Sequence, residues 1–183
     1  MSIELNVDFC NYEAAKYACL NWHYSKSMPA GKIVKIGVWE NNEYIGCILF
    51  SRGANNNIGK PYGLTQLEIC ELTRVALNNH STPTTQIIAR AIKLFKNYNT
   101  GIKLIVSYAD MEQNHIGIIY QAGNWIYEGY TESKKTCPPV ELFGKMIHSR
   151  TINNRYGTAN IDWLRNNVDK NARRMYELKG KHK

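Results

Sequence analysis

The sequence lacks any apolar run near the roughly 18 residues that a membrane-spanning helix needs, which argues against a membrane protein. Its opening residues, MSIELNVDFC, contain acids and no basic segment followed by an apolar one, so no secretory signal is expected. Cysteine is scarce: the 5 cysteines are widely spaced and none forms a C-x-x-C pair. This pattern indicates neither a disulfide framework nor a zinc ribbon. We expect a cytoplasmic protein that does not enter a membrane.

The chain does carry a marked charge asymmetry. Residues 145–183 hold 10 of the 23 Lys and Arg residues against 3 acids, so this segment carries +7 of the formal +8. Residues 1–144 hold 13 basic and 12 acidic side chains and are nearly neutral. We expect a globular domain over 1–144 and a basic extension over 145–183 that packs on or continues the same domain. Such asymmetry indicates a polyanionic partner, with DNA or RNA the first choice, although a basic tail can also serve solubility alone. The oligomeric state is unknown from the sequence.

Apolar periodicity and breaker residues predict alternating helices and strands. The sequence Ser81-Thr82-Pro83 is typical of a helix start, with a hydroxyl cap and proline at the first helical position. A polar loop of Gly and Asn residues is expected over 53–63. The order of elements predicts an α/β (α+β) protein with a mixed central sheet flanked by helices. The expected helices cover 11–22, 81–97, 115–122, 161–166 and 171–179, and the expected strands cover 32–39, 44–52, 67–77, 102–108 and 125–131.

That order resembles the acyltransferase fold of the GNAT N-acetyltransferases. Residues 71–77 (ELTRVAL) look like the central strand that leads into the helix cradling a donor, and residues 104–108 (LIVSY) look like the following strand. Residues 120–125 (YQAGNW) resemble a late Tyr-x-x-x-Gly-aromatic element. The resemblance implies a single GNAT-like domain. It also aligns Tyr120 with the tyrosine that protonates the leaving group in many of these enzymes.

A narrower resemblance is carried by four strings in order: WHYSK at 22–26, LFSRGA at 49–54, SYAD at 107–110 and YQAGNW at 120–125. Together they resemble the phage Mom family over roughly residues 10–160. The resemblance implies a transferase that adds a carbamoylmethyl group to the N6 amine of adenine in DNA and so shields phage DNA from host restriction. An ordinary acetyltransferase acting on a small-molecule or protein amine, and a non-catalytic nucleic-acid-binding protein, remain alternatives.

The expected donor loop differs from that of ordinary acetyltransferases. Residues 78–86 (NNHSTPTTQ) contain no glycine, and Pro83 contributes no N–H. Amides and the dipole at this helix start could still hold an anion, although the hydroxyls could equally serve as plain caps. Acyl-coenzyme A and another phosphorylated or carboxylated donor, such as an aminoacyl-tRNA, are therefore both possible, and the cofactor is unknown. The candidate donor-binding residues are Ser81, Thr82, Thr84 and Thr85.

The chemistry requires a proton acceptor, because the N6 amine of adenine is a poor nucleophile, and donors that stabilise developing charge. Glu68 and Glu71 lie three apart on an expected strand, so they point to opposite faces, and either could instead pair with Arg74. Asp110 follows an expected strand at its carboxyl end, where open sheets place ligands, although it could also cap the next helix. The catalytic candidates are His23, Tyr24, Glu71, Ser107, Asp110 and Tyr120.

His23 ends the first expected helix and could act as a base, as a metal ligand or as a partner of the helix dipole. The 5 histidines form no H-x-x-x-H pair, so the sequence gives no independent metal site and iron remains only possible. If DNA is bound as a duplex, the adenine must be flipped out, and exposed rings such as Tyr24, Tyr62 or Trp125 could stack on it. The candidate DNA-contacting residues are Arg52, Lys170, Arg173 and Arg174.

Overall fold

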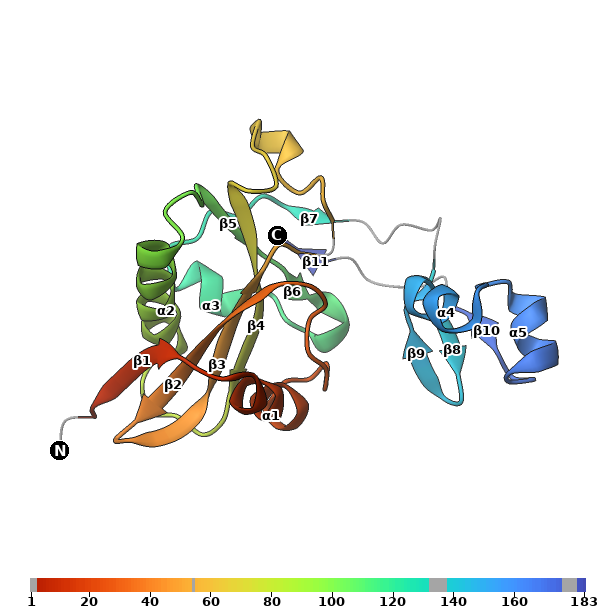
Figure 1. Ribbon diagram of the computed structural model, residues 1–183, viewed down its shortest axis with the longest axis horizontal. Coiled ribbons are helices and arrows are strands. Elements are labelled where there is room, and N and C mark those ends of the chain that lie inside the picture. The colour runs from red at the N-terminus through yellow and green to blue at the C-terminus, as the bar shows by residue number, and fades with distance from the viewer. Residues whose placement is uncertain (1–2, 54, 132–137, 176–180) are drawn as a thin grey trace. The chain divides into compact units, whose positions relative to one another are not determined.

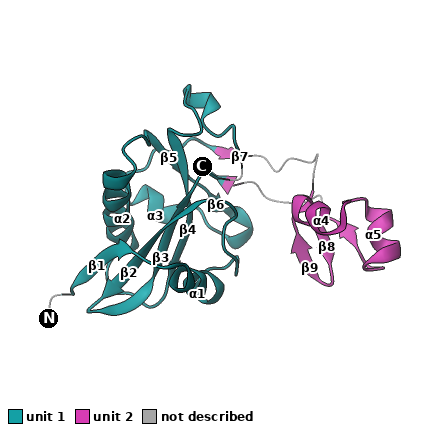
Figure 2. Cartoon of the chain, viewed as in Figure 1, with its two compact units in different colours: residues 1–129, 182–183 teal, residues 130–181 magenta. Residues whose placement is uncertain are grey.

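The computed structural model describes residues 3–53, 55–131, 138–175 and 181–183. The chain forms two compact units, one of Met1–Gly129 with His182–Lys183 and the other of Tyr130–Lys181 (Figure 2). In the second unit, β8 (Val140–Leu142) pairs with β9 (Lys145–Ile147). The boundary that charge suggested, between residues 144 and 145, therefore falls inside a hairpin.

The first unit is built on a five-stranded sheet with the order β1-β2-β3-β4-β5 (Figure 1). Neighbouring strands are antiparallel from β1 to β4, whereas β4 and β5 are parallel. Asn41 and Asn42 turn the β2–β3 hairpin with φ of 49° and 67°, as a two-residue hairpin requires. The expected mixed sheet of an α/β protein is thus confirmed. The strands are β1 (Leu5–Phe9), β2 (Ile33–Glu40), β3 (Glu43–Ser51), β4 (Ile69–Leu77) and β5 (Leu104–Ser107).

The sheet buries both faces because each face is covered by one amphipathic helix. Along β3, Ile48 and Phe50 pack with α2 (Thr84–Tyr98), whereas Cys47 and Leu49 pack with α1 (Tyr12–Trp22). This alternation follows from the two-residue repeat of a strand. On the α2 face, the rings of Phe50 and Phe95 stack with centroids 4.3 Å apart.

A bulge in β4 positions the site. Leu49 pairs with Arg74 and the next residue of β3, Phe50, pairs with Leu72, so Thr73 is an extra residue on β4. The parallel ladder joins residues 69–72 of β4 to residues 104–107 of β5 and ends beside this bulge. The carboxyl-terminal half of β4 and the segment after Ser107 therefore leave the shared ladder at the same level. This is where open α/β sheets place their ligands.

Short elements follow β5 along the chain. They comprise β6 (Ala109–Asp110), a 3-10 turn at Met111–Gln113 and α3 (Ile118–Gln121). Another 3-10 turn, at Lys60–Tyr62, lies between β3 and β4. Two further short strands are β7 (Tyr130–Thr131) and β11 (Lys181–His182). In the part of the chain that the structure describes, no helix has the length and apolarity to cross a bilayer.

The second unit has a core of its own. Its sheet has the order β10-β8-β9, where β10 is Arg173–Arg174, and its helices are α4 (Ser149–Tyr156) and α5 (Ile161–Asn167). These elements bury a compact apolar cluster, and each helix contributes one fully buried aliphatic side chain. The buried members are Val140, Leu142, Ile152, Leu164 and Ala172.

Several expected elements differ from the structure. The helix expected from Ser81 begins at Thr84, and Pro83 is its N-cap without a side-chain hydrogen bond. The strand expected over 125–131 shortens to Tyr130–Thr131, and β1 was not expected. The helix expected over 171–179 is wrong in its first part, because Arg173 and Arg174 form a strand paired with β8. Residues 176–180 lie outside the described residues.

Candidate active site

Three candidates from the sequence, His23, Tyr24 and Asp110, lie close together. His23 is the C-cap of α1, and its ring lies against that of Tyr24 with centroids 4.3 Å apart. Burial, the charge of Asp110 and a hydrogen bond with that carboxylate raise the pKa of Tyr24. Tyr24 therefore keeps its proton at neutral pH and connects α1 to the segment after β5. Asp110 also accepts a hydrogen bond from the Glu112 N–H at 3.1 Å, so it caps the next turn as well.

His115 joins this group, and sequence reasoning missed it. Its ring meets the Tyr24 ring edge to face with centroids 5.2 Å apart. The His115 N–H donates to the Asp110 carbonyl at 3.1 Å, which closes the intervening turn and brings the histidine back toward the site. No spacing motif marks it, so only a folded loop could have revealed it.

The hydrogen bonds of His23 define its tautomer. The Ser25 N–H donates to His23 Nδ1 at 3.1 Å, and the Ser25 hydroxyl lies 2.8 Å from the same nitrogen. Because a backbone N–H can only donate, Nδ1 is the acceptor and the neutral ring carries its proton on Nε2. Burial and the positive charge of Arg74 lower the pKa of His23 to about 4. His23 is therefore a neutral hydrogen-bond donor at Nε2, which fits a positioning role better than that of a base.

We expect His23 to make the protein less stable as the pH falls from its ordinary value of 6.5 toward about 4. In this window the unfolded state binds the proton and the folded state does not, so the free energy of unfolding decreases with decreasing pH. An NMR titration of the His23 ring, assigned by comparison with a His23→Gln variant, measures this directly. A midpoint near 6.5 in the folded protein would contradict the buried neutral ring.

Ser107, at the end of β5, and Tyr120, in α3, form a second polar pair. The Ser107 hydroxyl lies 2.7 Å from the Tyr120 hydroxyl and 3.0 Å from the Leu72 carbonyl. A carbonyl only accepts, so when Ser107 donates to Leu72 the Tyr120 hydroxyl donates to Ser107. Burial raises the pKa of Tyr120, and the hydrogen bond with Ser107 offsets part of that rise. A negative charge on Tyr120 would further raise the pKa of Tyr24, which places the two phenols in one electrostatic environment.

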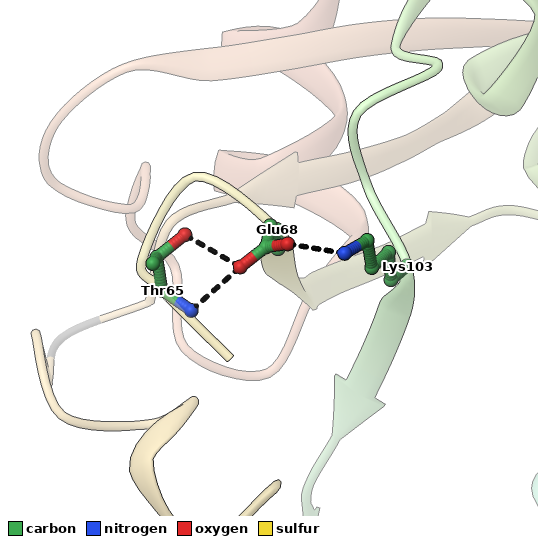
Figure 3. Close-up of polar contacts among 3 residues, drawn as sticks. All are labelled: Thr65, Glu68 and Lys103. Atoms are coloured by element: carbon green, nitrogen blue, oxygen red, sulfur yellow. Dashed lines mark hydrogen bonds and ion pairs between the residues drawn. The ribbon is translucent and has the colours of Figure 1, made fainter. Parts of the chain in front are cut away.

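The two glutamates of the expected strand have different surroundings. Glu68 precedes β4 and binds the Lys103 ammonium at 2.5 Å together with the amide and hydroxyl of Thr65 (Figure 3). The Lys103 contact, followed by those of Thr65, lowers the pKa of Glu68 to about 2. Its expected alternative partner, Arg74, instead donates to the Thr73 carbonyl at 2.8 Å.

Glu71 lies inside β4. A Cβ added at Gly53 would come within 2.7 Å of a Glu71 carboxylate oxygen, so this glycine lets the loop approach the carboxylate closely. Burial raises the pKa of Tyr108, and the negative charge of Glu71 raises it further. The same charge also contributes to the raised pKa of Tyr120.

Two of the four residues expected to bind the donor, Ser81 and Thr82, instead bind a carboxylate of the protein itself. The Ser81 and Thr82 amides donate to the two oxygens of Glu40, at 3.0 and 2.6 Å. His80 Nδ1 lies 2.7 Å from the Thr82 carbonyl, which helps to fix the loop. The segment before α2 therefore binds a carboxylate, as its sequence suggested, but this carboxylate belongs to the protein. Thr84 and Thr85 begin α2, where the first N–H groups of a helix have no partner within it.

Replacing Glu40 by Gln is expected to lower the free energy of unfolding by roughly 1–3 kcal/mol, because two buried hydrogen bonds lose their charged acceptor. Burial acts to raise the pKa of Glu40, but the bonds from Ser81 and Thr82 outweigh it and hold the pKa below its ordinary 4.5. This stabilisation is present above pH 4.5 and is lost as the pH falls through the lowered folded-state pKa. Urea melts at pH 7 and at pH 3 test both statements, with Glu43→Gln, an exposed position on the same hairpin, as the control.

The candidate DNA-contacting residues divide into two groups. Arg52 is exposed after β3 and lines a cavity of about 300 Å³ together with Lys32 and Asn99. In the second unit Lys170 is exposed, whereas the two expected arginines have protein partners. Arg173 forms an ion pair with Glu141 at 2.8 Å, and Arg174 donates to the Ala159 carbonyl at 2.6 Å.

The residues expected to stack on a flipped adenine lie in two different places. Tyr24 is 41% exposed. Tyr62 and Trp125 line a mainly apolar cavity of about 260 Å³, which Ser107 and Tyr120 also border. Among the described residues, no three His, Cys, Asp or Glu side chains are grouped so that they could hold a metal ion.

Three comparisons with known proteins each match most of the chain. A solved structure, the crystal structure of aminoglycoside 6'-acetyltransferase type Ii, is similar with a TM-score of 0.43 and 15% identity, covering 72% of this chain and 87% of that one. The methylcarbamoylase Mom of Escherichia phage Mu is 25% identical over 156 residues, which is 83% of this chain and 63% of the relative. The chain thus spans less than two thirds of that relative's length. The model of the Mom protein family matches residues 4–183, and the chain therefore belongs to the Mom protein family.

Proposed function

We propose that this chain is a transferase that adds a carbamoylmethyl group to the N6 amine of adenine in DNA. Membership of the Mom family and the similarity to a methylcarbamoylase support a group transfer. The observation that carries the proposal is that the Tyr24–Asp110 pair lies near the Ser107–Tyr120 pair, close enough for the charge of Tyr120 to act on Tyr24. One pair can take a proton from an amine, and the other can give one to a leaving group.

The proton acceptor in this proposal is Asp110. As the N6 nitrogen forms its new bond to carbon, it must lose a proton, and a carboxylate accepts that proton directly or through a bridging hydroxyl. The raised pKa of Tyr24 keeps its hydroxyl protonated, so Tyr24 can donate to Asp110 while its oxygen accepts the amine proton. The Nε2–H of His23 supplies a neutral donor beside this pair.

The proton donor in this proposal is Tyr120. When the bond between the transferred carbon and the leaving group breaks, the leaving atom gains an electron pair and needs a proton. Tyr120 is neutral because burial raises its pKa. After its O–H passes to the leaving atom, the phenoxide can accept a hydrogen bond from Ser107 at 2.7 Å until solvent supplies a new proton. These groups leave the donor molecule and its leaving group open.

Adenine in a duplex would have to leave the base stack to reach these side chains, which costs a few kcal/mol. The half-exposed Tyr24 ring offers a surface on which the flipped base could stack. A group on N6 alters the adenine edge that proteins read in the major groove. Modified DNA would then escape restriction enzymes that read this edge.

Mass spectrometry of nucleosides from plasmid DNA of cells expressing this chain tests the proposal. We expect deoxyadenosine that is heavier by one carbamoylmethyl group and is absent from cells with an empty vector. Unmodified DNA together with salt-dependent DNA binding would instead indicate a binding protein. Acetyl-coenzyme A turnover on small amines, with DNA left unmodified, would indicate an ordinary acetyltransferase.

A further inference from the structure

The second unit presents a polar helix face that the proposed chemistry does not use. In α4, Ser149 and Ile152 are buried and Tyr156 is partly buried, so one side of the helix packs on the unit's core. At 100° per residue the opposite side holds four residues, all of which are exposed. These are Arg150, Thr151, Asn154 and Arg155.

This face is positively charged, because α4 contains no acidic residue. Residues 138–175 hold seven Lys and Arg residues against three acids, and each acid has a partner elsewhere in the unit. Glu141 pairs with Arg173 at 2.8 Å, and Asp162 lies 3.6 Å from Arg165. Asp169 accepts from the Phe143 N–H at 2.6 Å. The three acids of residues 138–175 thus have these partners, and α4 itself places Arg150 and Arg155 on its outer face.

The helix is held in place at both ends. His148 Nδ1 accepts from the Arg150 N–H at 3.1 Å, and the Gly157 N–H donates to the Asn153 carbonyl at 2.8 Å with φ of 74°. A four-residue turn, 157–160, then leads to α5, whose N-cap Asn160 accepts from the Trp163 N–H at 3.0 Å. The connection is that of a helix-turn-helix, but the basic face here lies on the first helix, whereas helix-turn-helix proteins place their second helix in the DNA major groove.

We propose that the outer face of α4 is a DNA-binding surface. Arg150 and Arg155 contact phosphates, while Thr151 and Asn154 between them reach base edges. Arginine matches phosphate by charge and geometry, and asparagine can make a paired hydrogen bond with adenine in the major groove. The identification of DNA as the ligand rests on the proposed function. The presence of arginine and asparagine side chains on this face of α4 rests on the structure alone.

The test uses the full chain and a fluorescent duplex, with anisotropy measured across a series of salt concentrations. Arg150→Ala with Arg155→Ala should weaken binding about tenfold per lost contact near 50 mM salt and lower the salt slope by about 0.9 for each. The matched control is Lys93→Ala with Lys96→Ala, which removes two exposed cations from α2 in the first unit. It should leave binding close to that of the native chain.

The Asn154→Ala variant distinguishes recognition of bases from contacts with phosphates. It should change the ranking of adenine-containing duplexes while the salt slope stays the same, because phosphate contacts position the protein without specifying sequence. Circular dichroism and a melting curve for every variant establish that the second unit is folded. Equal losses in the two charge pairs, or no loss in the α4 pair, would overturn the proposal.

The outcomes also distinguish this surface from the transferase activity. If the α4 variants lose DNA binding while the native chain leaves DNA unmodified, the surface stands and the proposed transferase fails. If the native chain modifies DNA and the α4 variants bind duplex as tightly as it does, the transferase stands and the surface fails.

Discussion

Asp110→Asn is expected to lower the rate of adenine modification about 10²–10⁴-fold, the range typical of a lost general base. Asparagine keeps the size of the side chain and can still accept from the Glu112 N–H, so the turn after β6 should remain folded. It cannot take up the proton that the amine must lose. The measurement is the rate at which modified deoxyadenosine accumulates, followed by nucleoside mass spectrometry.

Glu112→Gln provides the matched control, because it removes one negative charge from the same turn. It should modify DNA at close to the native rate. Melting curves for both variants must match that of the native chain. Full modification by a folded Asp110→Asn variant would assign the proton acceptor to another group, with Glu71 the next candidate.

Tyr120→Phe is expected to lower the same rate about 10²-fold, because phenylalanine cannot protonate a leaving group. The substituted ring can keep its contact with Trp125, whose centroid lies 5.1 Å from that of Tyr120. Ser107→Ala should cost less, since the phenol itself remains. In the double variant, Ser107→Ala with Tyr120→Phe, the two losses of rate should fall well short of additive, because both changes remove the same Ser107–Tyr120 hydrogen bond.

Two readouts separate this role from a structural one. Loss of the Ser107–Tyr120 hydrogen bond costs about 1 kcal/mol of stability in either single variant, so similar melting curves with very different rates indicate catalysis. Tyr130→Phe, at an exposed tyrosine, should leave both quantities unchanged. If Tyr120→Phe retains the native rate, the leaving group is protonated elsewhere.

The parts of this fold that the sequence predicted are those with a strong local signal. The apolar stripe of α2 and the apolar runs of β2 and β3 produced correct elements, because α2 buries one face and these strands bury both. Four short strings placed His23, Tyr24, Ser107, Asp110 and Tyr120 as site residues, and the structure brings them to the end of the β4–β5 ladder. Their catalytic roles stay predictions.

The missed features depend on contacts between distant residues. Ser81 and Thr82 were expected to cap α2, but their amides bind Glu40, which lies 41 and 42 positions earlier. His115 reaches Tyr24 only after a folded turn returns it to the site. Arg173 was expected on a helix, yet it pairs with Glu141, 32 residues earlier, on a neighbouring strand. No periodicity within one segment encodes such pairings.

The chain enters and leaves the second unit at adjacent points. In the first unit the Lys183 N–H donates to the Gly129 carbonyl at 2.9 Å, and in the second the Thr131 hydroxyl donates to the Lys181 carbonyl at 3.3 Å. An insertion with neighbouring ends leaves the path of its host chain nearly unbroken. Recombination within the family could therefore exchange this unit as a cassette. Such an exchange would keep the proposed transfer site of the first unit and replace the proposed DNA-binding surface of the second.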